Sequence, residues 1–361
     1  MVATNAAAFS AYTFFLTSPT HGYSSKRLAD TQNGYPGTSL KSKSTPPPAA
    51  AAARNGALPL LASICKCPKK ADGSMQLDSS LVFGFQFYIR SYEVGADQTV
   101  SIQTVLNYLQ EAAINHVQSA GYFGDSFGAT PEMTKRNLIW VITKMQVLVD
   151  RYPAWGDVVQ VDTWTCSSGK NSMQRDWFVR DLKTGDIITR ASSVWVLMNR
   201  LTRKLSKIPE AVLEEAKLFV MNTAPTVDDN RKLPKLDGSS ADYVLSGLTP
   251  RWSDLDMNQH VNNVKYIAWI LESVPQSIPE THKLSAITVE YRRECGKNSV
   301  LQSLTNVSGD GITCGNSIIE CHHLLQLETG PEILLARTEW ISKEPGFRGA
   351  PIQAEKVYNN K

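Results

Sequence analysis

Three polar residues in the C-terminal half could act together on a carbonyl group. Asp256, Asn258 and His260 are spaced two residues apart, directly before a run of helical periodicity. If this stretch is extended, the three side chains share one face, because side chains alternate along a strand. An acid, an amide and an imidazole beside the free N–H groups of a helix could bind a polarised carbonyl and transfer a proton near neutral pH. Taken alone, helix caps and a surface histidine are an equally simple interpretation.

Glu294 and Cys295 form a second candidate group, at the end of the first strand predicted after that helix. An antiparallel sheet can return this end of the strand to the beginning of the helix, where the pair would join the first group. The second group therefore favours catalysis over a purely structural role.

Metal ligation explains these residues less well. A calcium loop that starts at Asp254 needs Gly at its sixth position and Glu at its twelfth, but the sequence has Gln259 and Lys265 there. Three of the four residues in a cluster rich in Cys and His fall on a predicted strand, where neighbours point opposite ways, so a structural role is the better interpretation. That cluster is Cys314, Cys321, His322 and His323. We predict neither a metal nor a cofactor.

Hydrophobic periodicity predicts one long helix followed by several strands in each half of the chain. Helices are predicted at 101–117 and 263–274, and strands at 81–89, 138–149, 157–164, 175–181, 187–198, 284–292, 299–307, 317–327 and 332–341. A long helix can cover the apolar face of an antiparallel sheet, in the arrangement called a hotdog.

The two halves repeat each other, which predicts an α+β fold of two tandem hotdogs whose sheets pair as the subunits of a dimer would. At an offset of 161 residues, Arg90, Glu93 and Glu111 match Arg251, Asp254 and Glu272. At an offset of 145 residues, Asn171, Ser172, Thr184, Gly185, Ala191 and Trp195 match Asn316, Ser317, Thr329, Gly330, Ala336 and Trp340.

The N-terminal copy lacks the polar residues of the C-terminal copy. Gly95, Asp97 and Thr99 stand where the first candidate group would be, and Tyr152 and Pro153 stand where the second would be. This half is therefore predicted to be a scaffold that also binds a chain-like ligand.

Charge separates a leader from the remainder of the chain. Residues 1–70 contain eight Lys or Arg and one acid, Asp30, and subtracting these from the chain's 37 bases and 34 acids leaves 29 and 33, a net charge of −4. A leader rich in Ser, Thr and Ala with few acids is typical of a transit peptide, here for a plastid. The acidic remainder does not favour nucleic acid, and no run of about 18 apolar residues predicts a transmembrane helix. The six scattered cysteines favour free thiols in a reducing compartment.

Two long motifs resemble the plant acyl-[acyl carrier protein] thioesterases, and the saturated-chain (B) class more than the oleoyl (A) class. These motifs are WSDLDMNQHVNNVKY at 252–266 and YRRECG at 291–296. NLIWV at 137–141 and RYPAWGDVV at 151–159 also match, so the resemblance covers roughly residues 81–342.

The resemblance implies an enzyme that hydrolyses fatty acyl chains from acyl carrier protein (ACP) in the plastid stroma. It would release free, mainly saturated fatty acid and so end chain elongation. The family pattern carries over to Asp256, Asn258, His260, Glu294 and Cys295. Its partner would be ACP carrying a fatty acyl chain, and the pseudo-dimer could pair again into a homodimer.

Together, the repeat and the resemblance predict the division of the chain. The predicted parts are a plastid transit peptide or disordered leader at 1–70, an N-terminal hotdog that binds the acyl chain at 80–204, a linker with some helix at 205–244, a catalytic C-terminal hotdog at 245–345 and a tail at 346–361.

Two routes could use the predicted residues on a thioester. In the first, Glu294 or His260 activates a water molecule, and Asp256 orients its partner. Asn258 and helix N–H groups then stabilise the oxyanion. In the second, His260 deprotonates Cys295, Asn258 orients the imidazole, and an acyl-enzyme forms.

Strand geometry bears on the choice between these routes. Neighbours in a regular strand face opposite sides, so Glu294 and Cys295 should not both point into one site without a bulge. The apolar parity of Ile287, Val289 and Tyr291 extrapolates to an inward Cys295. We favour the water route, because a thioester is already activated, and expect Glu294→Ala to abolish hydrolysis and Cys295→Ala to be tolerated.

Substrate contacts are predicted in the N-terminal copy. Candidates for lining the acyl-chain pocket are Leu106, Leu109, Trp140, Met145 and Val147, for which ordinary core packing is an equally good interpretation. Because ACP is acidic, a basic rim is also expected. Candidate ACP contacts are Arg200, Arg203, Lys204 and Lys207, for which a solvated turn is the alternative.

Two other functions fit a hotdog protein, because fold does not fix function. One is a non-catalytic acyl-binding protein, which would release no acid from any acyl-ACP. The other is a dehydratase acting on 3-hydroxyacyl-ACP, which would form an enoyl product and fits the spacing of the polar residues less well.

Overall fold

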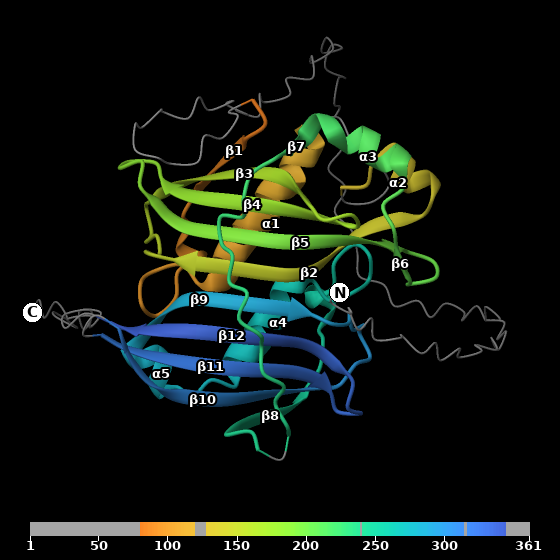
Figure 1. Ribbon diagram of the computed structural model, residues 1–361. Helices are drawn as coiled ribbons and strands as arrows, with labels where there is room; N and C mark the ends of the chain where they lie inside the picture. Colours follow the sequence, from red (N-terminus) through yellow and green to blue (C-terminus); the bar gives the residue numbers. More distant parts are fainter. Residues whose placement is uncertain (1–79, 120–127, 239, 314–315, 344–361) are drawn as a thin grey trace, which may run out of the picture. The chain divides into compact units, whose positions relative to one another are not determined.

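The protein is described from a computed structural model that places residues 80–119, 128–238, 240–313 and 316–343 (Figure 1). The predicted leader at 1–70, the predicted tail at 346–361 and Cys314 lie outside these described residues. Within the described ranges, no helix has the combined length and hydrophobicity that a membrane span requires.

The N-terminal half is built around one long helix, α1 (Ile102–Ser119). This helix forms because apolar residues recur every three or four positions, and it buries Val105, Leu106, Leu109 and Ala112. The other elements of the N-terminal half are β1 (Phe83–Tyr88), η1 (Ser91–Glu93), α2 (Pro131–Lys135), β2 (Leu138–Val149), β3 (Val158–Ser168), β4 (Ser172–Asp181), β5 (Ile187–Asn199), β6 (Leu205–Ser206), α3 (Glu210–Ala216), η2 (Lys217–Phe219) and β7 (Val220–Met221).

The C-terminal half repeats this plan around α4 (Asn263–Glu272). The side chain of Asn262 caps this helix by accepting the N–H of Val264 at 2.9 Å. The other elements are β8 (Tyr243–Leu248), η3 (Trp252–Asp254), α5 (Ser277–Thr281), β9 (His282–Tyr291), β10 (Leu301–Thr313), β11 (Asn316–Leu327) and β12 (Glu332–Ser342).

One twelve-stranded sheet runs through both halves, in the order β1-β3-β4-β5-β2-β9-β12-β11-β10-β8, with β6 and β7 attached beside this path (Figure 1). The halves join where β2 pairs antiparallel with β9, from Lys144 opposite Glu290 to Leu148 opposite Ala286. The predicted α+β fold of two tandem hotdogs is confirmed, with the sheets paired edge to edge.

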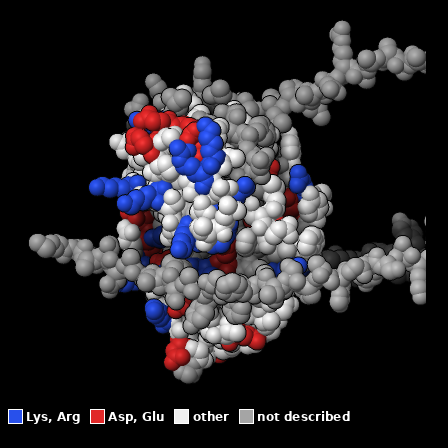
Figure 2. Space-filling model, turned by 90° about the vertical axis from the view of Figure 1, so that its right-hand side faces the viewer, with Lys and Arg blue, Asp and Glu red and all other residues white. Residues whose placement is uncertain are grey.

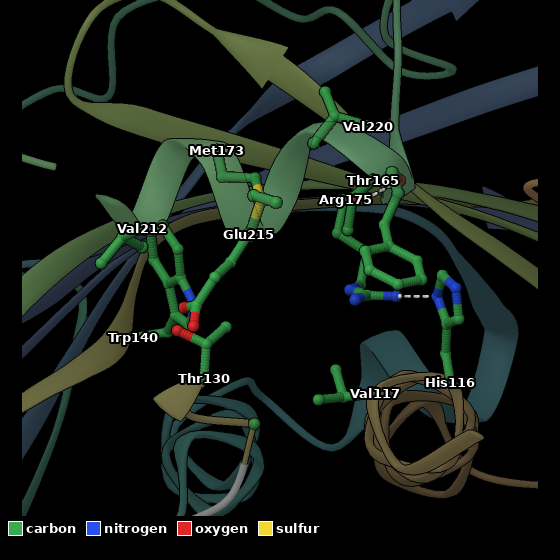
Figure 3. Close-up of a pocket in the computed structure, with 13 residues that line it drawn as sticks. His116, Val117, Thr130, Trp140, Thr165, Met173, Arg175, Val212, Glu215 and Val220 are labelled. Carbon is green, nitrogen blue, oxygen red and sulfur yellow. Dashed lines mark hydrogen bonds between the residues drawn. The ribbon is translucent and has the colours of Figure 1, made fainter. Parts of the chain in front are cut away.

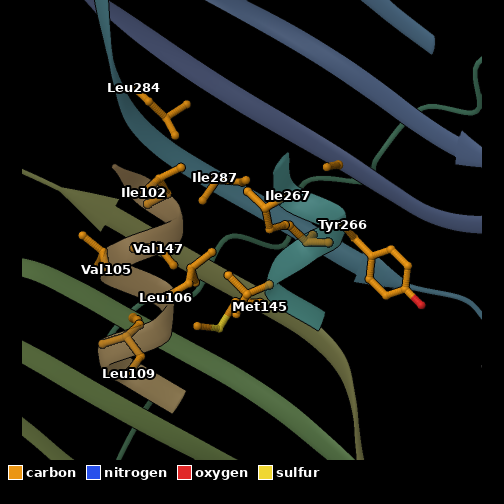
Figure 4. Close-up of a cluster of buried hydrophobic side chains, with 14 of the residues drawn as sticks. Ile102, Val105, Leu106, Leu109, Met145, Val147, Tyr266, Ile267, Leu284 and Ile287 are labelled. Atoms are coloured by element: carbon orange, nitrogen blue, oxygen red, sulfur yellow. The ribbon is translucent and has the colours of Figure 1, made fainter. Parts of the chain in front are cut away.

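The apolar core is continuous across this junction (Figure 4). Met145 and Val147 of β2, Ile287 of β9, Leu106 of α1 and Ile267 of α4 belong to the same buried cluster. Because burial of apolar surface drives folding, this shared core couples the two helices to one sheet.

The repeat extends to individual hydrogen bonds in the turns that precede α1 and α4. The N–H of Gln98 donates to the Gly95 carbonyl and that of Gln259 to the Asp256 carbonyl, each at 3.0 Å. The two glutamines have φ angles of 64° and 63°. Both pairs are related by the offset of 161 residues, so the structure supports the predicted duplication.

Part of the predicted linker forms a strap, residues 222–238, that crosses the outer face of the sheet (Figure 1). Thr226 donates to the Ala191 carbonyl of β5 at 2.8 Å, and the Asp229 carbonyl accepts the Lys144 ammonium of β2 at 2.8 Å. Farther along, Leu233 packs in a buried cluster with Leu304 of β10. The strap therefore spans strands of both halves.

Candidate active site

The stretch predicted to be extended forms a tight turn instead. Leu255 and Val261 pair across it, and the N–H of Asp256 donates to the His260 carbonyl at 2.8 Å. The prediction of an extended stretch is therefore wrong. Asp and Asn side chains favour such turns because they hydrogen-bond nearby backbone groups, and Gln259 closes this one in the left-handed region.

Asp256 holds the turn through its carboxylate. Its Oδ1 accepts the backbone N–H of Asn258 at 2.8 Å and that of His260 at 3.3 Å. The acid thus fixes the main chain that carries the imidazole. The side chain of Asn258 is exposed.

An open pocket brings together three of the five predicted residues: His260, Glu294 and Cys295. Nε2 of His260 lies 3.8 Å from Oε2 of Glu294. The pocket is completed by Gln259, Gly296, Lys297, Asn298 and Ser299. Asp256 and Asn258 belong to the turn that carries His260 and are not among the lining residues.

Glu294 and Cys295 both line the pocket because they lie beyond the end of β9, where strand alternation no longer applies. Strand β9 ends at Tyr291, and the N–H groups of Arg292 and Arg293 then both donate to the Ile333 carbonyl, at 2.8 and 3.0 Å. Two donors on one acceptor interrupt the alternation of a strand. A β-bulge is therefore present at Arg292 and Arg293, immediately before the loop that carries Glu294 and Cys295.

Main-chain contacts tie the loop after the bulge to the helix that follows His260. The Cys295 carbonyl accepts the N–H of Val261 at 3.2 Å. The Cys295 N–H donates to the hydroxyl of Tyr266, a buried residue of α4, at 3.0 Å. The end of β9 thus returns to the beginning of α4.

Arg203 contacts Glu294 from the N-terminal half. Its Nε donates to Oε1 of Glu294 at 2.8 Å, and its Nη2 contacts Oε2. Arg203 was predicted as an ACP contact, and its place beside Glu294 was missed. No local periodicity could have indicated this pair, because 91 residues separate the two positions.

The match to known families follows the two halves. Acyl-ACP thioesterase N-terminal and C-terminal domain families match residues 80–216 and 239–342. The chain belongs to the acyl-ACP thioesterase family. It is 62% identical over 274 residues to the chloroplastic palmitoyl-acyl carrier protein thioesterase of Arabidopsis thaliana, a match that covers 74% of this chain and 66% of that protein.

Two further relatives agree with this assignment. The chain is 58% identical over 274 residues to the chloroplastic acyl-[acyl-carrier-protein] hydrolase FATB2 of Cuphea viscosissima, covering 76% of this chain and 66% of that protein. The solved 12:0-ACP thioesterase from Umbellularia californica shares 54% identity with a TM-score of 0.68, over 73% of this chain and 95% of that one. The predicted plant B class is confirmed. The chain spans just under two thirds of the length of the two curated relatives named here.

Within this family member, the Cys295 thiol is poorly suited to act as a nucleophile. The residue is 4% exposed, and burial raises the pKa of its thiol. Since the thiolate is the reactive form, the environment disfavours an attack by sulfur.

The predicted acyl-pocket residues divide into two groups. Trp140 lines a second pocket, at the end of α1 and beneath α3, together with Val117, Met173 and Val212 (Figure 3). Leu106, Leu109, Met145 and Val147 are buried in the main core (Figure 4).

Two buried polar side chains, His116 and Arg175, line one side of this second pocket (Figure 3). Nη1 of Arg175 donates to Nδ1 of His116 at 3.1 Å. Burial, with a smaller contribution from Arg175, lowers the pKa of His116 to about 3, and burial lowers the pKa of Arg175 to about 10. His116 is therefore neutral at physiological pH and can accept the hydrogen bond.

The predicted ACP contacts other than Arg203 lie on the surface. Arg200, Lys204 and Lys207 are exposed, and Arg200 Nε donates to the side-chain oxygen of Asn137 at 3.3 Å. Figure 2 shows Lys and Arg side chains interspersed with Asp and Glu on the face it presents.

Proposed function

We propose that this protein hydrolyses the thioester of a fatty acyl chain carried by ACP and releases free, mainly saturated fatty acid. One observation carries the proposal: an imidazole and a carboxylate, His260 and Glu294, face each other across 3.8 Å in an open pocket. Membership of the acyl-ACP thioesterase family supports it, and the chloroplastic relatives support action in a plastid. Within the plastid, we assign the activity to the stroma.

The separation of the two groups suits a bridging water molecule. At 3.8 Å the two groups do not hydrogen-bond directly, and the open pocket gives a water molecule access to both. The imidazole of His260 or the carboxylate of Glu294 takes a proton from that water as its oxygen attacks the thioester carbonyl. The collapse of the tetrahedral intermediate breaks the C–S bond, and the proton passes to the departing thiolate of the carrier.

The remaining predicted residues have supporting roles in this proposal. Asp256 orients His260 by holding its main chain. The Asn258 amide, exposed beside the pocket, is free to turn toward the oxyanion with N–H groups near the start of α4. Cys295 contributes its backbone carbonyl and N–H, and these contacts do not depend on its thiol.

We place the acyl chain in the N-terminal half and the carrier at its edge. The pocket beneath α3 offers apolar side chains from Trp140, Met173 and Val212. The other four predicted lining residues form the core wall behind the chain in this proposal: Leu106, Leu109, Met145 and Val147. Arg200, Lys204 and Lys207 supply positive charge for an acidic carrier.

Direct assay tests the proposal. The protein from about residue 70 onward is incubated with acyl-ACP of defined chain lengths, and free acid is measured. We expect release from saturated acyl-ACP, loss of release in Glu294→Ala, and substantial activity in Cys295→Ala. A radiolabelled acyl group trapped as a thioester on Cys295 would instead establish the covalent route. Tight acyl binding without release, or an enoyl product from 3-hydroxyacyl-ACP, would overturn the proposed hydrolysis.

A further inference from the structure

Arg203 connects the N-terminal half to the reacting groups. Its guanidinium contacts both oxygens of Glu294, and the two side chains are 31% and 33% exposed. Two parallel contacts fix both the position and the plane of a carboxylate, which the single point charge of a lysine does not do. The same Oε2 atom that meets Arg203 lies 3.8 Å from His260.

The turn that carries Arg203 is built to hold it in place. Arg203 has a φ of 55°, in the left-handed region that a side chain disfavours. Its N–H donates to the Asn199 carbonyl at 2.8 Å. The Asn199 side chain accepts the N–H groups of Leu201 and Thr202 at 3.0 and 2.9 Å. These three hydrogen bonds fix the turn that carries the arginine, at a position where glycine would be less strained.

We propose that Arg203 is a positioning residue of the hydrolytic site, which holds Glu294 in the orientation that meets His260. This inference rests on the proposed function. It replaces the prediction that Arg203 contacts ACP, because a guanidinium already engaged by both oxygens of a carboxylate is poorly placed to bind a second acidic partner. The N-terminal half then serves the chemistry as well as the substrate.

The experiment compares two substrates with the same acyl chain, acyl-ACP and the small thioester acyl-N-acetylcysteamine. Arg203→Gln removes the charge, and Arg203→Lys keeps the charge but loses the paired contact. We expect both variants to lower kcat by about 10- to 100-fold on both substrates, with KM for acyl-ACP little changed. Lys183→Gln, an equal loss of charge at the exposed β4–β5 turn, should leave both rates unchanged.

A double-mutant cycle separates positioning from a general effect on the fold. In a Glu294→Asp background, which keeps the carboxylate but shortens its reach, Arg203→Gln should lower the rate much less than in the wild type, because the paired contact is already altered. Additive losses would overturn the inference, even if the midpoint of unfolding had also shifted. Urea unfolding of each variant provides that midpoint.

Two other results would also overturn the inference. A rise in KM confined to acyl-ACP and sensitive to salt would make Arg203 a docking contact, and unchanged rates on both substrates would give it no role. In either case the wild-type enzyme remains active and the proposed function stands. A wild-type protein that releases no acid from either thioester would overturn the proposed function and this inference with it.

Discussion

Asp256 acts on the main chain of a turn, and its carboxylate reaches His260 through a backbone N–H. This arrangement differs from a carboxylate that hydrogen-bonds the imidazole of a catalytic histidine. A side chain that accepts a backbone N–H needs an oxygen with the right geometry. A negative charge strengthens the hydrogen bond without being essential to it. The distinction can be tested by changing the charge and the oxygen separately.

Asp256→Asn and Asp256→Ala should therefore have different effects on hydrolysis. The asparagine keeps an oxygen that can accept the N–H groups of Asn258 and His260, so we expect most of kcat to remain. The alanine removes both contacts and frees the imidazole to move, which should lower kcat by about 100-fold. Rates on acyl-ACP provide the measurement. Equal losses in the two variants would show that the charge itself is required.

His323 predicts how stability depends on pH. It is 1% exposed and lies between the hydroxyls of Thr305 and Thr338, each at 2.8 Å, and burial, with a smaller contribution from His322, lowers its pKa to about 3. Below pH 6.5 the unfolded chain takes up a proton that the folded protein excludes, so the free energy of unfolding falls as the pH falls toward 3.

We expect this one histidine to contribute a loss of about 2 kcal/mol between pH 7 and pH 5. Urea unfolding at the two pH values measures the total change, to which the buried His116 also contributes. His323→Gln should reduce the pH dependence by about that amount. An unaltered dependence in this variant would mean that folding does not lower the pKa of His323.

At the scale of elements, hydrophobic periodicity predicted the regular helices and strands. The predicted strand at 138–149 coincides with β2, and the predicted helix at 101–117 differs from α1 by two residues or fewer at each end. The turn at 256–260 was missed because alternating polar residues also suit a strand, and only the side-chain contacts of Asp256 decide between the two. A bulge was predicted only as a condition for Glu294 and Cys295 to reach one site. The local sequence did not indicate its position, directly beyond Tyr291.

The strap offers a test of stability at this scale. Asp229 accepts hydrogen bonds from Arg231 and lies beside Arg337, which is 3% exposed, and the hydrogen bond from Arg231 holds the pKa of Asp229 well below its usual range. Removing the carboxylate leaves the Arg337 guanidinium with only its more distant partners, Glu320 and Glu339.

Asp229→Ala should thus lower the free energy of unfolding by about 1 to 3 kcal/mol. The matched control is Asp228→Ala, because Asp228 is exposed and accepts a hydrogen bond only from Asn230. Urea unfolding of the two variants gives the comparison. Similar small losses in both would mean that the strap adds little to stability.

At the scale of the whole molecule, the two halves form one continuous structure. They share a sheet through β2 and β9 and a core through Val147 and Ile287, which face each other across that pairing. The pseudo-dimer was predictable because duplicated residues mark it. The reach of Arg203 into the other half was not, because it depends on how the two copies are placed.

Ile287→Ala tests whether the halves unfold together. This side chain is 2% exposed, and its truncation should lower the free energy of unfolding by about 2 to 5 kcal/mol. Tryptophan fluorescence and circular dichroism should report one coincident transition, at a lower urea concentration than in the wild type. Two separate transitions, with only one displaced, would show that the halves are independent domains.

The bulge immediately before Glu294 has a counterpart in the N-terminal half. The N–H groups of Asp150 and Arg151 both donate to the Ile188 carbonyl, at 3.0 and 3.3 Å, although no catalytic pair follows them. The kink is thus older than the division of labour between the copies, as expected of a gene fusion between two once-identical subunits. An ancestor made of two identical subunits would have carried two such polar groups per pair, and the present chain keeps one, around His260 and Glu294.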